Sequence, residues 1–188
     1  MVKERVKIGV IGVGHLGQHH AKHYKNLSSA ELIGIFDEDK MAGKLISEKY
    51  KVKLFDSVKS LIDEVEAVSV VTPTKSHYKI SKLCIQNNIH VFIEKPITAT
   101  LKQADSLLKL SEKSNTIIQV GHIERLNPAL IALKSYNINP KLIEIQRLAP
   151  YTARGTDVPV VLDKMIHDID IILSLVNSKV ETIDASGL

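Results

Sequence analysis

Three glycines near the N-terminus have the spacing of a phosphate-binding turn. Residues 12–17 read GVGHLG, directly after the β-branched run VKIGVI and directly before a segment with helical character. In such a turn the first glycine permits a tight bend, the second lets a pyrophosphate approach the backbone, and the third lets helix and strand pack closely. The N-terminus of the helix then favours the negative charge. The candidate dinucleotide-binding residues of the turn are Gly12, Gly14, His15, Leu16 and Gly17.

An acidic residue, Asp37, stands twenty residues after the last glycine, at the end of the next strand-like run. A carboxylate there accepts hydrogen bonds from a ribose 2′-hydroxyl and repels a 2′-phosphate. Glu38 and Asp39 add to that repulsion, and no arginine follows that could pair with such a phosphate. The sequence therefore predicts NAD as the cofactor in preference to NADP.

Two later segments carry side chains that can stabilise an anion or move a proton. Lys95 follows the strand-like run HVFI, and ligands of parallel sheets bind at the carboxyl ends of strands. Asp163 and His167 are four residues apart, so on a helix they share one face and can hydrogen-bond. A carboxylate that orients an imidazole is a common way to make a general base. Taken singly, a surface lysine and a capping or core histidine are the ordinary alternatives.

These residues must be positioned by regular elements, and the sequence alternates strand-like and helical segments. The strand-like segments are 5–11, 31–36, 66–71, 90–93 and 116–120. The helical segments are 15–26, 39–50, a short one within 55–65, 76–87 and 101–114. Such alternation, with few polar residues in the strands, predicts an α/β fold with a doubly wound parallel (Rossmann) sheet over residues 1–123.

The pattern changes after residue 123. Segments 127–136 and 162–175 read as helices, whereas 141–148 and 180–186 alternate like strands of an antiparallel sheet with one wet face. Residues 124–188 are therefore expected to begin a second α+β domain. Two strands are too few to bury a sheet face alone, so we expect the chain to stop inside that domain.

Together these segments resemble the Gfo/Idh/MocA oxidoreductase family. The matching residues are GVGHLG at 12–17, Asp37, TPTKSH at 72–77, EKP at 94–96 and DKMIHDID at 163–170. The resemblance implies a second domain with a large, mostly antiparallel sheet. It also implies metal-free oxidation of a sugar or cyclitol secondary alcohol to a ketone, with hydride passing to NAD(P). In that reaction Lys95, Asp163 and His167 would bind the hydroxyl and move its proton. The residues that the resemblance places around the cofactor are Thr72, Pro73, His77, Glu94 and Lys95.

A finer resemblance points to the subgroup of that family that acts on UDP-N-acetylhexosamines. It is carried by GHIERLNP at 121–128, Arg147, Arg154 and VVLDKMIHDID at 160–170. It implies oxidation at the 3-position and Arg125, Asn127 and Arg154 as substrate-binding residues, while the resemblance to the whole family implies homodimers or homotetramers. Arginines suit a diphosphate physically. The alternative for Arg125 is a structural role at the junction of the two domains.

Composition excludes several other classes of protein. With 188 residues, 44% apolar and 24% charged, the chain has the values of a globular protein. Its net charge of +4 comes from lysines scattered among acids, which predicts no nucleic-acid partner. No apolar run approaches the ~20 residues that span a bilayer, so no membrane partner is expected. The single cysteine, Cys84, is expected to be a small core residue of a cytoplasmic protein.

Three histidines in one helical segment, His19, His20 and His23, invite a metal-site interpretation. No cysteine or matching acid completes such a site, so surface histidines and no metal are expected. Two other functions stay open beside the nucleotide-sugar dehydrogenase. One is a free-sugar or inositol-like dehydrogenase, and the other is a non-catalytic NAD-binding regulator or cofactor-binding fragment on the same fold. The presence of Lys95 and His167 favours an enzyme, because a sensor needs no base.

Overall fold

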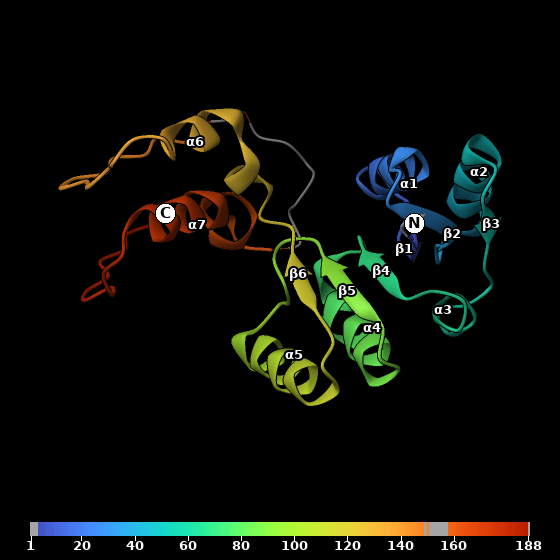
Figure 1. Cartoon of the computed structure of the whole chain (residues 1–188). Coiled ribbons are helices and arrows are strands. Elements are labelled where there is room, and N and C mark those ends of the chain that lie inside the picture. The colour runs from blue at the N-terminus through green and yellow to red at the C-terminus, as the bar shows by residue number, and fades with distance from the viewer. Residues whose placement is uncertain (1–3, 149, 151–157, 188) are drawn as a thin grey trace. The chain divides into compact units, whose positions relative to one another are not determined.

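The computed structural model describes residues 4–148, residue 150 and residues 158–187, and the chain divides into two units between Gly121 and His122 (Figure 1). In the first unit six strands form one sheet in the order β3-β2-β1-β4-β5-β6, with every pair parallel. This is the strand order of a Rossmann fold. The predicted doubly wound parallel sheet is confirmed.

The observed elements follow the predicted ones closely. The strands are β1 (Val6–Ile11), β2 (Ala30–Phe36), β3 (Lys53–Leu54), β4 (Ala67–Val70), β5 (His90–Ile93) and β6 (Ile118–Val120). The helices of this unit are α1 (Gly17–Asn26), α2 (Lys40–Tyr50), α3 (Val58–Ile62), α4 (Thr74–Gln86) and α5 (Leu101–Ser114). Strand β3 was not among the predicted segments, because two residues are too few to show a period of two.

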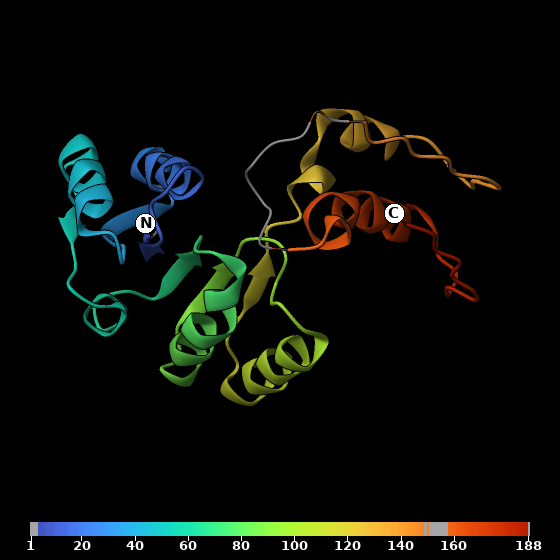
Figure 2. The ribbon, with the colours of Figure 1, turned by 180° about the vertical axis from the view of Figure 1, so that it is seen from behind.

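Each face of the sheet has its own apolar core. Val10 packs in one cluster with Ala21 of α1 and Ile46 of α2. Its neighbour Ile11 points the other way, into a cluster that includes Leu107 of α5 and residues of α3 and α4. Figures 1 and 2 show α1 beside α2, and α4 beside α5. Because helices cover both faces, the strands carry few polar residues, one in each strand, as their sequences predicted.

Side-chain caps and left-handed residues set the ends of several helices. Asp39 accepts hydrogen bonds from two backbone N–H groups at the start of α2, and Thr100 does the same for one at the start of α5. These two helices end at Lys51 and Asn115, which have φ values of 51° and 53°. Among the described residues, no helix is long and apolar enough to cross a membrane.

Cys84 lies in α4, and its side chain is fully buried in the core that α3, α4 and α5 form with the sheet. Burial raises the pKa of its thiol to about 12. The nucleophilic thiolate is therefore scarce near neutral pH, and the prediction of a small core residue is confirmed.

The second unit is helical within the part of it that the structure describes. Its elements are the 3₁₀ turn η1 (Ile123–Leu126), α6 (Pro128–Leu133), the π-helical turn η2 (Val161–Met165) and α7 (Ile166–Leu175). The predicted strands at 141–148 and 180–186 do not form, and their described residues have no β pairing. Alternation supplies one apolar face, but a strand also needs a hydrogen-bonding neighbour, and neither segment pairs with one.

Leu107 and Leu108, adjacent in α5, provide a matched test of the core. Leu107 is 0% exposed and Leu108 is 49% exposed. We expect Leu107→Ala to lower the free energy of unfolding in urea by about 2–5 kcal/mol, because it leaves a cavity. We expect Leu108→Ala to change it by about 0.5 kcal/mol or less. Equal effects of the two substitutions would contradict the assignment of the core.

Candidate dinucleotide and catalytic site

The three glycines of the turn between β1 and α1 have different surroundings. Gly12 has a φ of +86°, and a Cβ there would lie 2.7 Å from the carbonyl oxygen of Val71. A Cβ on Gly17 would collide with the carbonyl oxygen of Gly12. A Cβ on Gly14 would meet no atom within 4 Å. The chain's own packing thus requires the first and third glycines, whereas the second faces open space where a ligand can approach the backbone.

Helix α1 begins at this turn without a side-chain cap. Leu16 occupies the N-cap position and makes no capping hydrogen bond, and the first turn contains no acidic residue. An uncapped helix N-terminus presents N–H groups and the positive end of the helix dipole, both of which favour an anion. The turn and the helix start therefore fit the pyrophosphate of a dinucleotide.

Asp37 follows β2, and its carboxylate lies against the glycine turn. Its Oδ2 accepts a hydrogen bond of 2.7 Å from the backbone N–H of Val13, and its Oδ1 accepts one of 2.9 Å from that of Asp39. Carboxylate oxygens have several lone pairs, so both remain able to accept a bond from a hydroxyl. The side chain predicted to bind a ribose also holds the phosphate turn, a contact that the sequence did not indicate.

His77 of α4 braces the two loops that follow β4 and β5. Its Nε2 lies 2.8 Å from the carbonyl oxygen of Thr72, and its Nδ1 lies 2.9 Å from that of Pro96. The residue is only 1% exposed. The resemblance places His77 at the cofactor pocket, and its contact with a cofactor stays a prediction; the structure shows its ring enclosed between the two loops. Thr72 and the exposed Pro73 remain placed at the carboxyl end of β4.

Glu94, directly after β5, is bound by a histidine of α1. Its Oε1 lies 3.0 Å from Nε2 of His20, while Nδ1 of His20 lies 3.3 Å from the hydroxyl of Ser69. The side chains of His20 and Glu94 are 18% and 14% exposed. The expectation that His20 is a surface histidine is therefore wrong. Its partners are 49 and 74 residues away in the chain, so no local signal could have identified the contact.

The residues expected to handle the proton occupy both units. Lys95, partly buried, follows Glu94 in the first unit. In the second unit, Asp163 lies in the π-helical turn η2 and His167 lies in the first turn of α7. The sequence predicted one uninterrupted helix over this stretch. A π-helical turn within a helix is rare and is often found at functional sites, which agrees with chemistry at this position.

Two arginines of the second unit form bidentate ion pairs with aspartates of α7. Arg125 donates from Nε and Nη2 to Asp170 at 2.7 and 2.6 Å, and Arg147 donates to Asp168 at 2.6 Å. Hydrogen bonds from the two guanidinium groups lower the pKa of both carboxyls. For Arg125 this contact supports the structural alternative, although within one unit and not between two domains. Its role in substrate binding remains a prediction.

The other two candidate substrate residues are Asn127 and Arg154. Asn127 caps α6 by accepting a hydrogen bond of 3.0 Å from the N–H of Ala129, and it donates one of 3.2 Å to Glu124. Its contact with substrate stays a prediction. Arg154 lies outside the described residues.

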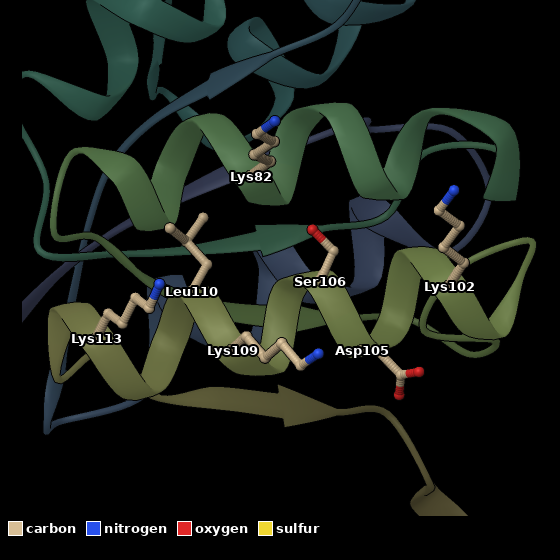
Figure 3. Close-up of a pocket in the computed structure, with 7 residues that line it drawn as sticks. All are labelled: Lys82, Lys102, Asp105, Ser106, Lys109, Leu110 and Lys113. Carbon is tan, nitrogen blue, oxygen red and sulfur yellow. The ribbon is translucent and has the colours of Figure 1, made fainter.

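A hollow of about 600 Å³ lies between α4 and α5, and it contains none of the candidate site residues (Figure 3). The side chains around it are Lys82, Lys102, Asp105, Ser106, Lys109, Leu110 and Lys113. It lies in the helical layer on one face of the sheet, and four of its lining residues are lysines.

Gly14 and Gly17 allow the phosphate site to be tested separately from folding. We expect Gly14→Ala to keep the wild-type melting temperature but to weaken NADH binding by about tenfold or more, because its methyl group occupies the ligand's approach to the backbone. Gly17→Ala should lose stability as well, since its Cβ meets the Gly12 carbonyl. Isothermal titration and thermal denaturation measure the two effects. Unchanged NADH affinity in Gly14→Ala would place the cofactor elsewhere.

Comparisons with known proteins find a matching oxidoreductase family and several similar enzymes. Residues 6–122 match the GFO_IDH_MocA family model, described as an oxidoreductase family with an NAD-binding Rossmann fold. A UDP-N-acetylglucosamine 3-dehydrogenase from Acidithiobacillus ferrooxidans is 37% identical over 184 residues, which cover 97% of this chain and 58% of that protein. A myo-inositol 2-dehydrogenase from Thermotoga maritima is 29% identical over 197 residues, with coverages of 97% and 58%.

A solved structure of the Acidithiobacillus ferrooxidans enzyme superimposes with a TM-score of 0.86 at 38% identity, covering 91% of this chain and 56% of that one. The chain thus spans somewhat over half the length of these relatives. The matched family model covers the glycine turn, Asp37 and the loops after β4 and β5. The chain belongs to the Gfo/Idh/MocA family of oxidoreductases, with an NAD-binding Rossmann fold.

Proposed function

We propose that the chain carries the cofactor site and the proton-handling residues of an NAD-dependent dehydrogenase. Its substrate in this proposal is a UDP-N-acetylhexosamine, whose 3-hydroxyl is oxidised to a ketone. The observation that carries the proposal is the glycine turn, where Gly14 faces open space and Asp37 lies against the backbone. The choice of substrate is supported by the likeness to a UDP-N-acetylglucosamine 3-dehydrogenase over nearly the whole chain.

The bound nicotinamide supplies a hydride acceptor, and the chain's side chains manage the hydroxyl. In the proposed mechanism Lys95 donates a hydrogen bond to the reacting oxygen and stabilises the negative charge that develops there. His167 takes the hydroxyl proton as a general base, with Asp163 orienting the imidazole and stabilising its charged form. The positions of Lys95 after a strand end and of His167 after a π-helical turn support these roles.

The preference for NAD over NADP in this proposal rests on charge at the end of β2. The carboxylate of Asp37 is held beside the turn by the Val13 N–H, and Glu38 and Asp39 follow it. A 2′-phosphate placed near these carboxylates would be repelled. The expected homodimer or homotetramer and the cytoplasmic location belong to the same proposal.

The proton-handling roles can be tested by turnover of UDP-N-acetylglucosamine with NAD⁺, followed through NADH fluorescence. We expect Lys95→Ala and His167→Ala each to lower kcat on the order of 10²-fold, because each removes a group that acts on the reacting oxygen or its proton. Lys113→Ala, which changes a lysine at the hollow between α4 and α5, is the matched control and should leave kcat unaltered.

Near-wild-type turnover in either variant would remove that residue from the chemistry. Myo-inositol in the same assay separates nucleotide-sugar from cyclitol oxidation. Binding of NAD by the wild-type chain without turnover of either compound would favour the non-catalytic regulator.

Cofactor preference can be tested with Asp37→Asn. Loss of the negative charge should raise the affinity for NADPH relative to NADH by about tenfold, equivalent to about 1.4 kcal/mol. Fluorescence titrations of both reduced cofactors measure the ratio of their dissociation constants. Glu112→Gln, which changes an exposed acid of α5 outside the cofactor site, is the control for a general change in surface charge. An unaltered ratio in Asp37→Asn would separate Asp37 from the selection of NAD.

A further inference from the structure

The residues on both sides of Lys95 are contacted by histidines from opposite faces of the sheet, one through a side chain and one through the backbone. On one side, His20 of α1 binds the carboxylate of Glu94 at 3.0 Å. On the other, His77 of α4 binds the carbonyl of Pro96 at 2.9 Å. The sheet itself contributes a third restraint, since the N–H of Glu94 donates to the carbonyl of Val70 at 3.0 Å.

We propose that His20 and His77 are positioning residues for Lys95. They would hold the E-K-P segment so that the Lys95 ammonium reaches one defined place at the carboxyl end of β5. The inference rests on the proposed function, in which Lys95 acts on the reacting hydroxyl. The inference assigns His20 and His77 the role of positioning Lys95, which is separate from the binding of phosphate by the glycine turn and from proton transfer by Lys95, Asp163 and His167.

The environment of His20 is built to orient its ring. The ring meets Phe92 edge-on with centroids 5.5 Å apart, and it also makes an edge contact with Tyr24. The hydroxyl of Ser69, a fully buried residue, lies 2.7 Å from the hydroxyl of Tyr24 and 3.3 Å from Nδ1 of His20. Both ring nitrogens therefore have polar partners, and aromatic contacts restrict rotation of the ring.

Donors and acceptors along this chain of contacts can all be matched. Tyr24 can donate to Ser69, Ser69 to Nδ1 of His20, and the Nε2–H of His20 to the carboxylate of Glu94. A fully satisfied network of partly buried polar groups is rigid, because breaking one bond leaves its partners unsatisfied. The titratable groups that face His20 in this network are Glu94, from the end of β5, and Tyr24, from the same helix.

His77 restrains the other side of the loop by a backbone contact. Pro96 has no N–H, so its carbonyl is its only backbone hydrogen-bonding group. That carbonyl and the carbonyl of Thr72 both lie within hydrogen-bonding distance of the enclosed His77 ring. A neutral imidazole has one N–H and donates to one of these two carbonyls at a time. The enclosed ring also lies directly between the segment containing Lys95 and the loop after β4, so a shift of either loop is resisted by contact with the ring.

Helix α1 links this arrangement to the cofactor site. The helix that begins at the glycine turn carries His20 within its first turn, and Ala21 beside it is fully buried in the core. The element expected to receive the pyrophosphate therefore also holds Glu94 next to Lys95. A displacement of a catalytic group by about 1 Å can cost on the order of 10²-fold in rate, which is why such restraints matter.

The decisive variants are His20→Ala, His20→Gln and, as a matched control, His23→Ala, an exposed histidine of the same helix. We expect His20→Ala to lower kcat for UDP-N-acetylglucosamine by about tenfold or more. Its dissociation constant for NADH should stay within about twofold, because the buried Ala21 still anchors α1. His20→Gln should recover most of the lost kcat, since its amide can donate to Glu94. His23→Ala should match the wild type.

Two results would overturn the proposal. One is a kcat for His20→Ala equal to that of His23→Ala. The other is a joint loss of kcat, NADH affinity and melting temperature that glutamine does not rescue, which is the pattern of a purely structural residue.

A second measurement does not depend on turnover. The rate at which an amine-reactive acylating reagent labels Lys95 is followed by mass spectrometry, with Lys113 of the same molecule as the internal reference. We expect severalfold faster labelling of Lys95 in His20→Ala and in His77→Leu, which has no N–H to donate to the Pro96 carbonyl, than in the wild type and His23→Ala. Equal labelling in all four proteins would refute positioning. If the wild type oxidises no sugar, the proposed function fails, while the labelling still decides whether the histidines hold Lys95.

Discussion

The contact between Gly17 and the carbonyl oxygen of Gly12 leaves no room for a side chain, and it sets how closely α1 approaches the end of β1. This single close approach directs the N-terminus of α1 at the space that Gly14 leaves open. It also places Ala21 in the core and His20 against Ser69 and Glu94. A helix displaced by even one methyl group would move the phosphate site and the support of Lys95 together.

Polar contacts concentrate at the carboxyl edge of the sheet, outside the two apolar cores. Asp37 holds the glycine turn, and His77 holds the loops after β4 and β5. The side chains of Asp37, His20 and Glu94 each meet a backbone or side-chain partner, which avoids the cost of unsatisfied burial, whereas the buried hydroxyl of Thr72 has no hydrogen-bond partner among the described residues. The polar residues of the site therefore lie at the carboxyl ends of the strands, above two aliphatic cores. Their positions depend on helices and strands that these cores hold in place.

In the described residues of the second unit, ion pairs hold the helices in place to a greater extent than buried apolar side chains do. Within its described residues, the bidentate pairs of Arg125 with Asp170 and of Arg147 with Asp168 attach α7 to the preceding segments. Guanidinium hydrogen bonds lower the pKa of both aspartates, so this support is present above the normal aspartate range and is lost as the pH falls below it. His167 lies in the same helix, directly before Asp168, so these pairs fix the helix that carries the proposed base.

The sequence by itself determined the parallel sheet, the glycine turn and the acid that follows it, because these depend on residues that are near neighbours in the chain. Alternation alone misidentified 141–148 and 180–186 as strands, since pairing requires a partner strand that no local pattern specifies. Only the tertiary structure revealed that His20 binds Glu94, 74 residues away, and that Arg125 is committed to Asp170, 45 residues away. Hydrogen bonds between such distant groups depend on strand register and helix placement, and these follow from packing of the whole unit and not from any short stretch of sequence.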